Sequence, residues 1–168
     1  MPNRIADARQ FAVAAHGSQT YGFEPYSVHL DAVAASASPF GEDAQVCAYL
    51  NDVVEDTNVS IDSIRDRFGE QMAQYVSLLT DESGVNRKER KARTNAKLKA
   101  VPAELNLALI VKAADRLSNL QASAKSADQS KLEMYRKEHA AFSDAVYRAG
   151  LCDALWQAMD RILAPATK

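Results

Sequence analysis

Apolar side chains recur every three to four positions along most of the chain, which is the spacing of an amphipathic helix. The alternating β-branched runs that predict a half-buried strand are rare. Glycine and proline stand between the periodic segments, where helices end and loops turn. The pattern therefore predicts an all-α protein. The expected helices span residues 3–16, 26–36, 42–55, 70–80, 86–98, 103–121, 129–147 and 151–163, with a short helix between the cap residue Ser60 and Gly69.

Length and composition fit a single domain that covers residues 1–168. A hydrophobic content of 47% is enough for one core, and the net charge of −2 argues against a nucleic-acid-binding protein. There is neither a run of about 18 apolar residues nor the basic-then-apolar order of a signal peptide, so we expect a cytoplasmic protein that does not enter a membrane. Cys47 and Cys152 lack metal-ligand spacing and are expected to be reduced, buried thiols.

The motif LNDVVEDT, residues 50–57, contains the polar residues Asn51, Asp52, Glu55 and Asp56 in a segment with the pattern of a buried helix. On a helix these four side chains fall within one arc and converge on a small volume. Three carboxylates so close raise each other's pKa unless a cation neutralises them, so the motif indicates a metal site. A solvated acidic helix end is the alternative, because acidic helix faces are common.

A second segment, ELNLALIVKAADRLSNL, carries an aspartate on an apolar helical face. Asp115 recurs at helical spacing with Ala108 and Val111, so its carboxylate is expected to be largely buried. A buried carboxylate needs a neutralising partner, because burial of an isolated charge is costly. The neighbouring Arg116 is expected to point away. This leaves a metal ion, or alternatively a lysine or arginine from elsewhere in the fold.

A third segment, EPYSVHLDAV, holds His29 one helical turn after Tyr26, on a short helix entered through Pro25. Imidazole is the commonest ligand of transition metals, so His29 is a candidate ligand. The alternative is a hydrogen-bonded core histidine, which is the more frequent role of a single histidine on an apolar helix.

The segment RKERKARTNAKLK, residues 87–99, concentrates positive charge in an acidic protein. Such a patch attracts polyphosphate ligands, although a solvated helix whose basic side chains cover apolar surface has the same composition. The segment carries one acid, Glu89, and seven basic residues, Arg87, Lys88, Arg90, Lys91, Arg93, Lys97 and Lys99.

The order of the motifs PYSVHL, YLNDVVEDT and VKAADRLSNL resembles that of the HD-domain metal-dependent phosphohydrolases. The resemblance is greatest to the small alarmone hydrolases, which are related to the hydrolase half of RelA/SpoT proteins. It extends to AAHGSQ near the N-terminus and to IDSIRDRFGEQMAQYVSLLTD, and so covers nearly the whole chain. The resemblance implies a compact multi-helix bundle around one Mn²⁺ ion. The implied reaction is hydrolysis of the 3′-pyrophosphate of ppGpp or, in some members, of a nucleotide phosphate such as that of NADPH.

The same resemblance implies a role for individual residues. The family's metal ligands fall on His29, Asp52 and Asp115, while Asn51 stands where the family has the histidine of its HD pair. The acidic pair that orients or activates the attacking water falls on Glu55 and Asp56, of which Glu55 is the better candidate base. The implied substrate contacts are Tyr21, Arg87, Lys88, Arg90, Lys112, Asn119 and Tyr135.

Two positions depart from the family pattern. An amide oxygen at Asn51 binds first-row transition ions less tightly than imidazole does, so we expect weak metal binding and a preference for Mn²⁺ or Mg²⁺ over Zn²⁺. Relatives carry an Arg-Lys pair near the guanine base where this chain has Thr20 and Tyr21. Stacking of a base on Tyr21 would replace the lost cation only in part.

Two hypotheses therefore remain open. The first is an active or weakened Mn²⁺-dependent pyrophosphohydrolase that acts on ppGpp or a related nucleotide. The second is a catalytically inactive relative that binds a nucleotide as a sensor or sequestering protein. Retention of Glu55 and Asp56 favours the first, and Asn51 favours the second. The sequence indicates no oligomeric state.

Overall fold

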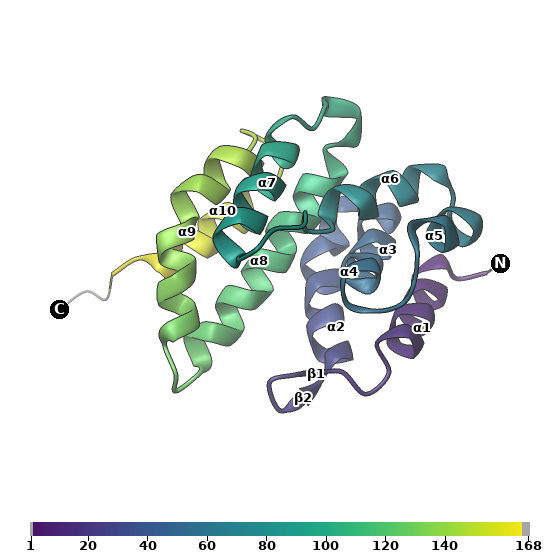
Figure 1. The fold of residues 1–168 in the computed structure, drawn as a ribbon, viewed down its shortest axis with the longest axis horizontal. Coiled ribbons are helices and arrows are strands. Elements are labelled where there is room, and N and C mark those ends of the chain that lie inside the picture. Colours follow the sequence, from purple (N-terminus) through teal and green to yellow (C-terminus); the bar gives the residue numbers. More distant parts are fainter. Residues whose placement is uncertain (1, 166–168) are drawn as a thin grey trace.

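The computed structural model describes residues 2–165, and this part of the chain is built almost entirely from helices (Figure 1). The prediction of an all-α protein is confirmed, since the strands are a hairpin of two residues each. In chain order the elements are α1 (Arg4–His16), β1 (Thr20–Tyr21), β2 (Glu24–Pro25), α2 (Tyr26–Ala37), η1 (Ser38–Phe40), α3 (Glu42–Leu50), α4 (Val53–Asp56), α5 (Ile61–Phe68), α6 (Glu70–Leu79), α7 (Arg87–Lys99), η2 (Ala103–Leu105), α8 (Leu107–Lys125), α9 (Ser130–Val146) and α10 (Asp153–Leu163), where η marks a 3-10 helix.

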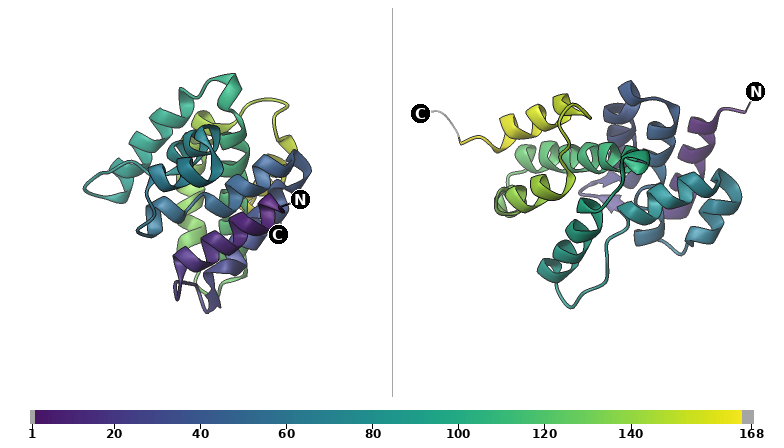
Figure 2. Two further views of the ribbon diagram at one scale, coloured as in Figure 1. Left: turned by 90° about the vertical axis from the view of Figure 1, so that its right-hand side faces the viewer. Right: turned by 90° about the horizontal axis from the view of Figure 1, so that it is seen from above.

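The long helix α8 runs through the middle of the molecule and connects two groups of helices (Figures 1 and 2). On one side α8 packs against α2, α3 and α6, which form an N-terminal group with α1 and α5. On the other side it packs against α9 and α10, and α7 packs on α9. Buried residues occur on most of the circumference of α8, as expected for a helix inside a core. Side chains on α8 are therefore supported by both groups.

The packing of the core around α8 leads to a testable prediction about the free energy of unfolding. Leu109 on α8 is 1% exposed, so its replacement by alanine leaves a cavity that the surrounding helices fill only in part. We expect Leu109→Ala to lower the free energy of unfolding by about 2–5 kcal/mol in urea denaturation. Val85→Ala is the control, because Val85 is 88% exposed and should change stability by no more than about 0.5 kcal/mol. Equal effects of the two substitutions would contradict the prediction.

The helix predicted over residues 42–55 is two helices separated by a turn at Asn51 and Asp52, so the prediction of one continuous helix is wrong. The side-chain amide of Asn51 donates a hydrogen bond to the carbonyl oxygen of Ala48 at 2.6 Å and competes with the backbone bonds that would continue α3. The backbone of Asp52 has φ −101° and ψ −2°, at the edge of the helical region. The acidic residues are therefore presented from a turn and a one-turn helix.

The segment predicted as a loop between the first two helices contains the β-hairpin. Thr20 pairs with Pro25, and Tyr21 pairs with Glu24. Gly22 has φ +63° at the turn, a conformation that costs glycine little. The hairpin holds the ring of Tyr21 against α2, which a flexible loop would not do.

Two further expectations concern the cysteines and the membrane. Cys47 and Cys152 are both free and buried, as predicted for structural thiols. No helix within residues 2–165 combines the length and the apolar content needed to cross a bilayer.

Candidate functional site

Three residues that are far apart in the sequence meet in one place. His29 comes from α2, Asp52 from the turn between α3 and α4, and Asp115 from α8, and one ligand atom of each lies within 4.8 Å of the others. The distance from His29 Nε2 is 2.9 Å to Asp115 Oδ1 and 3.6 Å to Asp52 Oδ2. The structure thus brings together the three side chains predicted as metal ligands, and their role as ligands stays a prediction.

The ring of His29 is held on two sides. Its Nδ1 forms a hydrogen bond with Ser118 Oγ at 3.1 Å, which leaves Nε2 to face the carboxylates. The ring of Tyr21 stacks on the imidazole with centroids 4.4 Å apart and an angle of 15° between the planes. The hydroxyl of Tyr21 donates to Asn119 Oδ1 at 2.7 Å. Outer contacts of this kind fix the orientation of a metal-binding histidine.

Electrostatics couple His29 to both carboxylates. Burial lowers the pKa of His29, but its hydrogen bonds with Asp115 and Asp52 outweigh burial and raise the pKa to about 9. Burial raises the pKa of Asp115, and the pairing with His29 outweighs that effect and lowers it. An imidazole nitrogen and two carboxylates form a donor set that suits a divalent first-row cation. These residues therefore fit the metal that the sequence motifs imply.

Asp52 has a separate partner in the tyrosine that opens α2. The hydroxyl of Tyr26 donates a hydrogen bond to Asp52 Oδ2 at 2.7 Å. The ring of Tyr26 also packs against His29, with centroids 5.5 Å apart. Tyr26 thus orients one candidate ligand and contacts another, although the sequence pattern marked it only as a neighbour of His29.

Asn51 differs from the other three candidate ligands. Its side chain is almost fully buried, and its amide nitrogen is bound to the carbonyl oxygen of Ala48. Asn51 is not among the described residues that line the cavity at the candidate metal site. The bond to Ala48 engages only the amide nitrogen, whereas a metal ion would bind the amide oxygen, so the role of Asn51 as a ligand stays a prediction.

A polar cavity of about 160 Å³ opens beside the three candidate ligands. Its lining includes acidic side chains, which we call the acidic wall, and the basic side chains of Arg87, Lys91, Lys112 and Arg116, which we call the basic wall. The cavity thus combines groups that bind a cation with groups that bind an anion. The lining residues are Tyr26, His29, Asp52, Glu55, Asp56, Leu79, Asp81, Arg87, Lys91, Lys112, Asp115, Arg116, Asn119 and Tyr135.

The two candidate catalytic carboxylates both line this cavity and are separately held. Glu55 Oε1 accepts a hydrogen bond from the backbone N–H of Asp81 at 2.7 Å. Asp56 Oδ2 accepts from Gln19 Nε2 at 3.1 Å, and Gln19 Oε1 in turn accepts from His16 Nδ1 at 2.8 Å. Burial raises the pKa of Glu55 and of Asp56. A carboxylate with a raised pKa is a stronger base at neutral pH.

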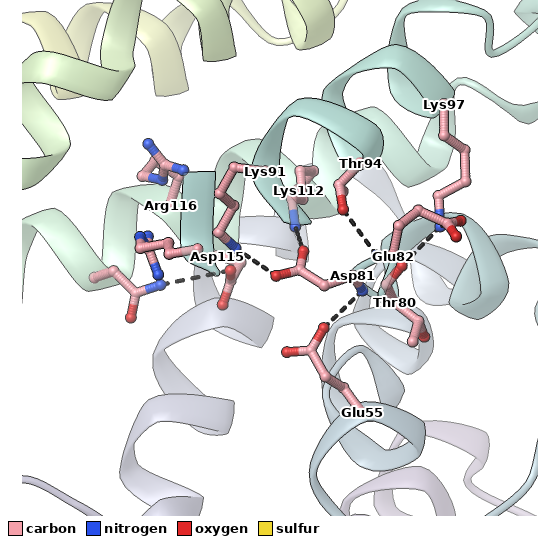
Figure 3. Close-up of polar contacts among 12 residues, drawn as sticks. Glu55, Thr80, Asp81, Glu82, Lys91, Thr94, Lys97, Lys112, Asp115 and Arg116 are labelled. Atoms are coloured by element: carbon pink, nitrogen blue, oxygen red, sulfur yellow. Dashed lines mark hydrogen bonds and ion pairs between the residues drawn. The ribbon is translucent and has the colours of Figure 1, made fainter. Parts of the chain in front are cut away.

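The basic wall is formed by four side chains, two of which are paired with one aspartate (Figure 3). Lys91 Nζ lies 2.6 Å from Asp81 Oδ2, and Lys112 Nζ lies 3.8 Å from Asp81 Oδ1. Arg87 Nε donates to Glu138 Oε2 at 2.8 Å. The fourth is Arg116. Among the predicted substrate contacts, Arg87, Lys112, Asn119 and Tyr135 line the cavity.

Three predicted substrate contacts lie elsewhere. Lys88 is exposed and lines a neighbouring groove between α7 and α9. Arg90 lines none of the cavities described, and its backbone nitrogen packs against Gly84. Tyr21 lines a second groove on the far side of His29, where one face of its ring is covered by the imidazole. A helix that carries many basic residues presents only part of them to one cavity.

Arg116 lines the cavity, but its guanidinium packs on α9 and not on Asp115, in line with the expectation that it points away from that aspartate. Its guanidinium is buried over the rings of Phe142 and Tyr135, at 3.9 and 4.8 Å from the centroids, and lies 3.7 Å from Glu138. Asp115 pairs with His29 rather than with a lysine or arginine. Sequence analysis also did not assign Asp81 to the site. It follows the end of α6 and is the last residue of the segment IDSIRDRFGEQMAQYVSLLTD, which carries the family resemblance but gives Asp81 no role of its own.

Comparisons with known proteins agree with this architecture. A family model described as HD domain matches residues 8–147. A guanosine-3′,5′-bis(diphosphate) 3′-pyrophosphohydrolase from Aquifex aeolicus is 33% identical over 120 residues, which are 70% of this chain and 17% of that protein. A probable enzyme of the same name from Synechocystis is 31% identical over 162 residues, 93% of this chain and 21% of that protein. The chain thus spans about a fifth of the length of these curated relatives.

The fold is also found in a solved structure. The protein, described as a metazoan ortholog of SpoT that hydrolyses ppGpp and plays a role in starvation responses, has a TM-score of 0.82 at 24% sequence identity. The match covers 96% of this chain and 94% of that one. At this identity the likeness shows a shared fold.

Proposed function

Because the chain belongs to the HD domain family, as its motifs predict, we propose that it is a metal-dependent phosphohydrolase that removes the 3′-pyrophosphate of ppGpp or cleaves a related phosphorylated nucleotide. The observation that carries this proposal is the meeting of His29, Asp52 and Asp115 in one cavity with an acidic and a basic wall. The names of the bacterial relatives support the choice of ppGpp as substrate.

His29, Asp52 and Asp115 would hold the divalent cation, and we propose Mn²⁺ because the donor set mixes one nitrogen with carboxylate oxygens. When bound, such an ion polarises a phosphoryl oxygen and lowers the pKa of a bound water. Tyr26 orients Asp52, and Ser118 orients His29, so both ligands are preorganised.

Glu55 is the proposed base. The backbone N–H of Asp81 fixes its Oε1, so Oε2 is the oxygen available to take a proton from the attacking water. Burial keeps the pKa of Glu55 above its ordinary value, which strengthens it as a base. Asp56, held by Gln19, would orient the same water.

The basic wall has a matching role. Lys91, Lys112 and Arg116 line the same cavity as Glu55 and would neutralise the charge of a diphosphate. Cations fixed in a partly dry site stabilise negative charge more than they do in water. We propose Asn119 and Tyr135 as contacts to the sugar or the 5′-side phosphates.

The alternative function is a catalytically inactive relative that binds a nucleotide as sensor or sequestering protein. It is favoured by Asn51, because the family resemblance places a histidine ligand at this position and an amide oxygen is a weaker ligand for first-row cations than imidazole nitrogen. Pyrophosphate and phosphate release from ppGpp, pppGpp and NADPH at high Mn²⁺ tests the two functions. Turnover by the unmodified protein supports the hydrolase, and turnover that appears only in Asn51→His supports the binding protein.

For Asn51→His we also predict a change in metal affinity. A histidine at position 51 offers an imidazole nitrogen in place of an amide oxygen, which binds first-row cations less tightly, so we expect Asn51→His to tighten Mn²⁺ binding by about 10-fold or more. Isothermal titration with Mn²⁺ measures this. Asn51→Ala is the control and should change the affinity by no more than about threefold, since Asn51 is not among the described residues that line the cavity. A large loss of affinity in Asn51→Ala would instead identify the amide as a ligand.

Metal binding should also release a proton. The pKa of His29 is raised to about 9, so at pH 7.5 its imidazole is protonated until a cation displaces the proton from Nε2. We expect about one proton released per Mn²⁺ bound, and an affinity that rises with pH until the pH reaches the pKa of His29. Titration calorimetry in buffers with different ionisation enthalpies measures the proton count. A heat of binding that does not depend on the buffer would contradict the expectation.

A further inference from the structure

Asp81 stands apart from the acidic motif and faces the basic wall of the cavity (Figure 3). Its carboxylate lies between Lys91 Nζ, at 2.6 Å, and Lys112 Nζ, at 3.8 Å. The side chain of Asp81 is 14% exposed, and those of the lysines are 24% and 13% exposed. In the part of the chain that the structure describes, neither lysine has another carboxylate within ion-pair distance. Asp81 therefore neutralises two of the cations that would receive an anionic ligand.

The backbone of Asp81 is fixed independently of its carboxylate. The backbone N–H of Asp81 donates a hydrogen bond to Glu55. The backbone N–H of Glu82 donates to Thr94 Oγ1 at 2.9 Å, and Lys97 Nζ donates to the carbonyl oxygen of Thr80 at 2.7 Å. The carboxylate can leave the lysines by rotation about its own side-chain bonds. The hydrogen bond that orients Glu55 does not depend on where the carboxylate points.

A phosphate oxygen forms the same kind of charge-assisted hydrogen bond with an ammonium group as a carboxylate oxygen does. Asp81 Oδ1 is buried and has no hydrogen-bond partner among the residues that the structure describes, so the pairing between the carboxylate and the two lysines is incomplete. Burial raises the pKa of Asp81, and the two lysines outweigh burial and lower it, so the carboxylate is charged at neutral pH. A diphosphate offers more acceptor oxygens and more charge at the same place.

We propose that Asp81 is an internal counter-ion that occupies the diphosphate subsite formed by Lys91 and Lys112 and that an incoming diphosphate must displace. The inference rests on the proposed function, because it takes a diphosphate as the group that enters the cavity. Asp81 then acts as a positioning residue that weakens ground-state binding. Its removal should act mainly on KM, because ground-state binding is lost or gained with little effect on the chemical step.

The test compares Asp81→Asn with a matched control. Asparagine keeps the size of the side chain and the backbone N–H but removes the charge that competes with an anion. Glu82→Gln makes the same change of charge on the next residue. The carboxylate of Glu82 pairs with Lys97 at 2.9 Å, and neither Glu82 nor Lys97 lines the cavity. The probe is inorganic pyrophosphate, titrated into the Mn²⁺-loaded protein in a calorimeter.

We expect Asp81→Asn to bind pyrophosphate about fivefold more tightly or better, which is the effect of one unit charge at about 4 Å. Glu82→Gln should stay within about twofold, since exposed charges are screened. The gain should disappear when Asp81→Asn is combined with Lys91→Met, because the two residues are coupled. Binding that is unchanged or weaker in Asp81→Asn overturns the proposal, and so does the absence of measurable binding in every variant.

Measurement of turnover tests the proposed function independently of the pyrophosphate titration. A protein that hydrolyses no nucleotide but shows tighter pyrophosphate binding in Asp81→Asn supports the counter-ion and contradicts the hydrolase. In an active protein, Asp81→Asn should lower KM by a larger factor than it changes kcat. A fall in kcat with KM unchanged would overturn the proposal, because it would mean that the carboxylate supports the structure around Glu55.

Discussion

Asp115→Asn should bind Mn²⁺ at least about 100-fold more weakly than the unmodified protein. Changes to residues that only support a ligand typically cost about 10- to 100-fold in affinity, and loss of a ligand should cost more. The substitution removes one of two negative charges from the candidate ligand set and breaks the pair with His29, which is 2.9 Å away. In the proposed function the ion would supply both electrostatic stabilisation and the activated water, so release of pyrophosphate from ppGpp should fall by about 1,000-fold or more.

The control for Asp115→Asn is Asp144→Asn. Asp144 is 68% exposed and pairs with Lys99 on the surface, so the same chemical change should leave Mn²⁺ affinity and turnover unaltered. Titration calorimetry measures the affinity, and thermal unfolding checks that each variant is folded. If Asp115→Asn keeps its affinity, the three side chains that meet in the cavity are not the metal site.

Glu55→Gln should lower kcat by about 100- to 10,000-fold, which is the range expected for loss of a general base. Glutamine keeps an oxygen that accepts the hydrogen bond from the backbone N–H of Asp81, so the side chain should remain in place. Mn²⁺ affinity should therefore stay within about threefold of the unmodified protein, since the ligand set is intact.

The matched comparison for Glu55→Gln is Asp56→Asn, because Asp56 lines the same cavity and also has a raised pKa. Single-turnover release of pyrophosphate at saturating Mn²⁺ separates the two. We expect the larger loss of rate in Glu55→Gln. A larger loss in Asp56→Asn would move the role of base to Asp56, and a loss of Mn²⁺ affinity in Glu55→Gln would identify Glu55 as a ligand.

The sequence predicts most of the helices because their positions follow from the period of apolar residues, and burial enforces that period locally. His29 and Asp115 stand out in the sequence as polar residues on apolar faces, Asp52 stands out in the acidic motif, and the family resemblance groups the three. The break at Asn51 was not predictable from the period, because a single side-chain hydrogen bond to Ala48 decides it.

Partners across the fold were harder to predict than the elements themselves. Arg116 faces away from Asp115 as expected, but the sequence around it does not indicate that its guanidinium packs on the rings of Tyr135 and Phe142 on α9. Asp81 belongs to the site because α7 and α8 bring Lys91 and Lys112 to it. Such contacts depend on how helices pack against one another, and the local sequence around each residue does not contain that information.

Helix α8 carries Lys112, Asp115, Arg116 and Asn119 toward the cavity, while its other faces fill the core between both groups of helices. The 19 residues of α8 therefore supply side chains both to the candidate site and to the core of the bundle. Insertion or deletion of one residue within α8 would turn the part of the helix after it by about 100° relative to the part before it, and both cavity and core residues would lose their positions. Evolution of new specificity in such a bundle is thus directed toward the turns and neighbouring helices, whose side chains can change while this central element keeps its register.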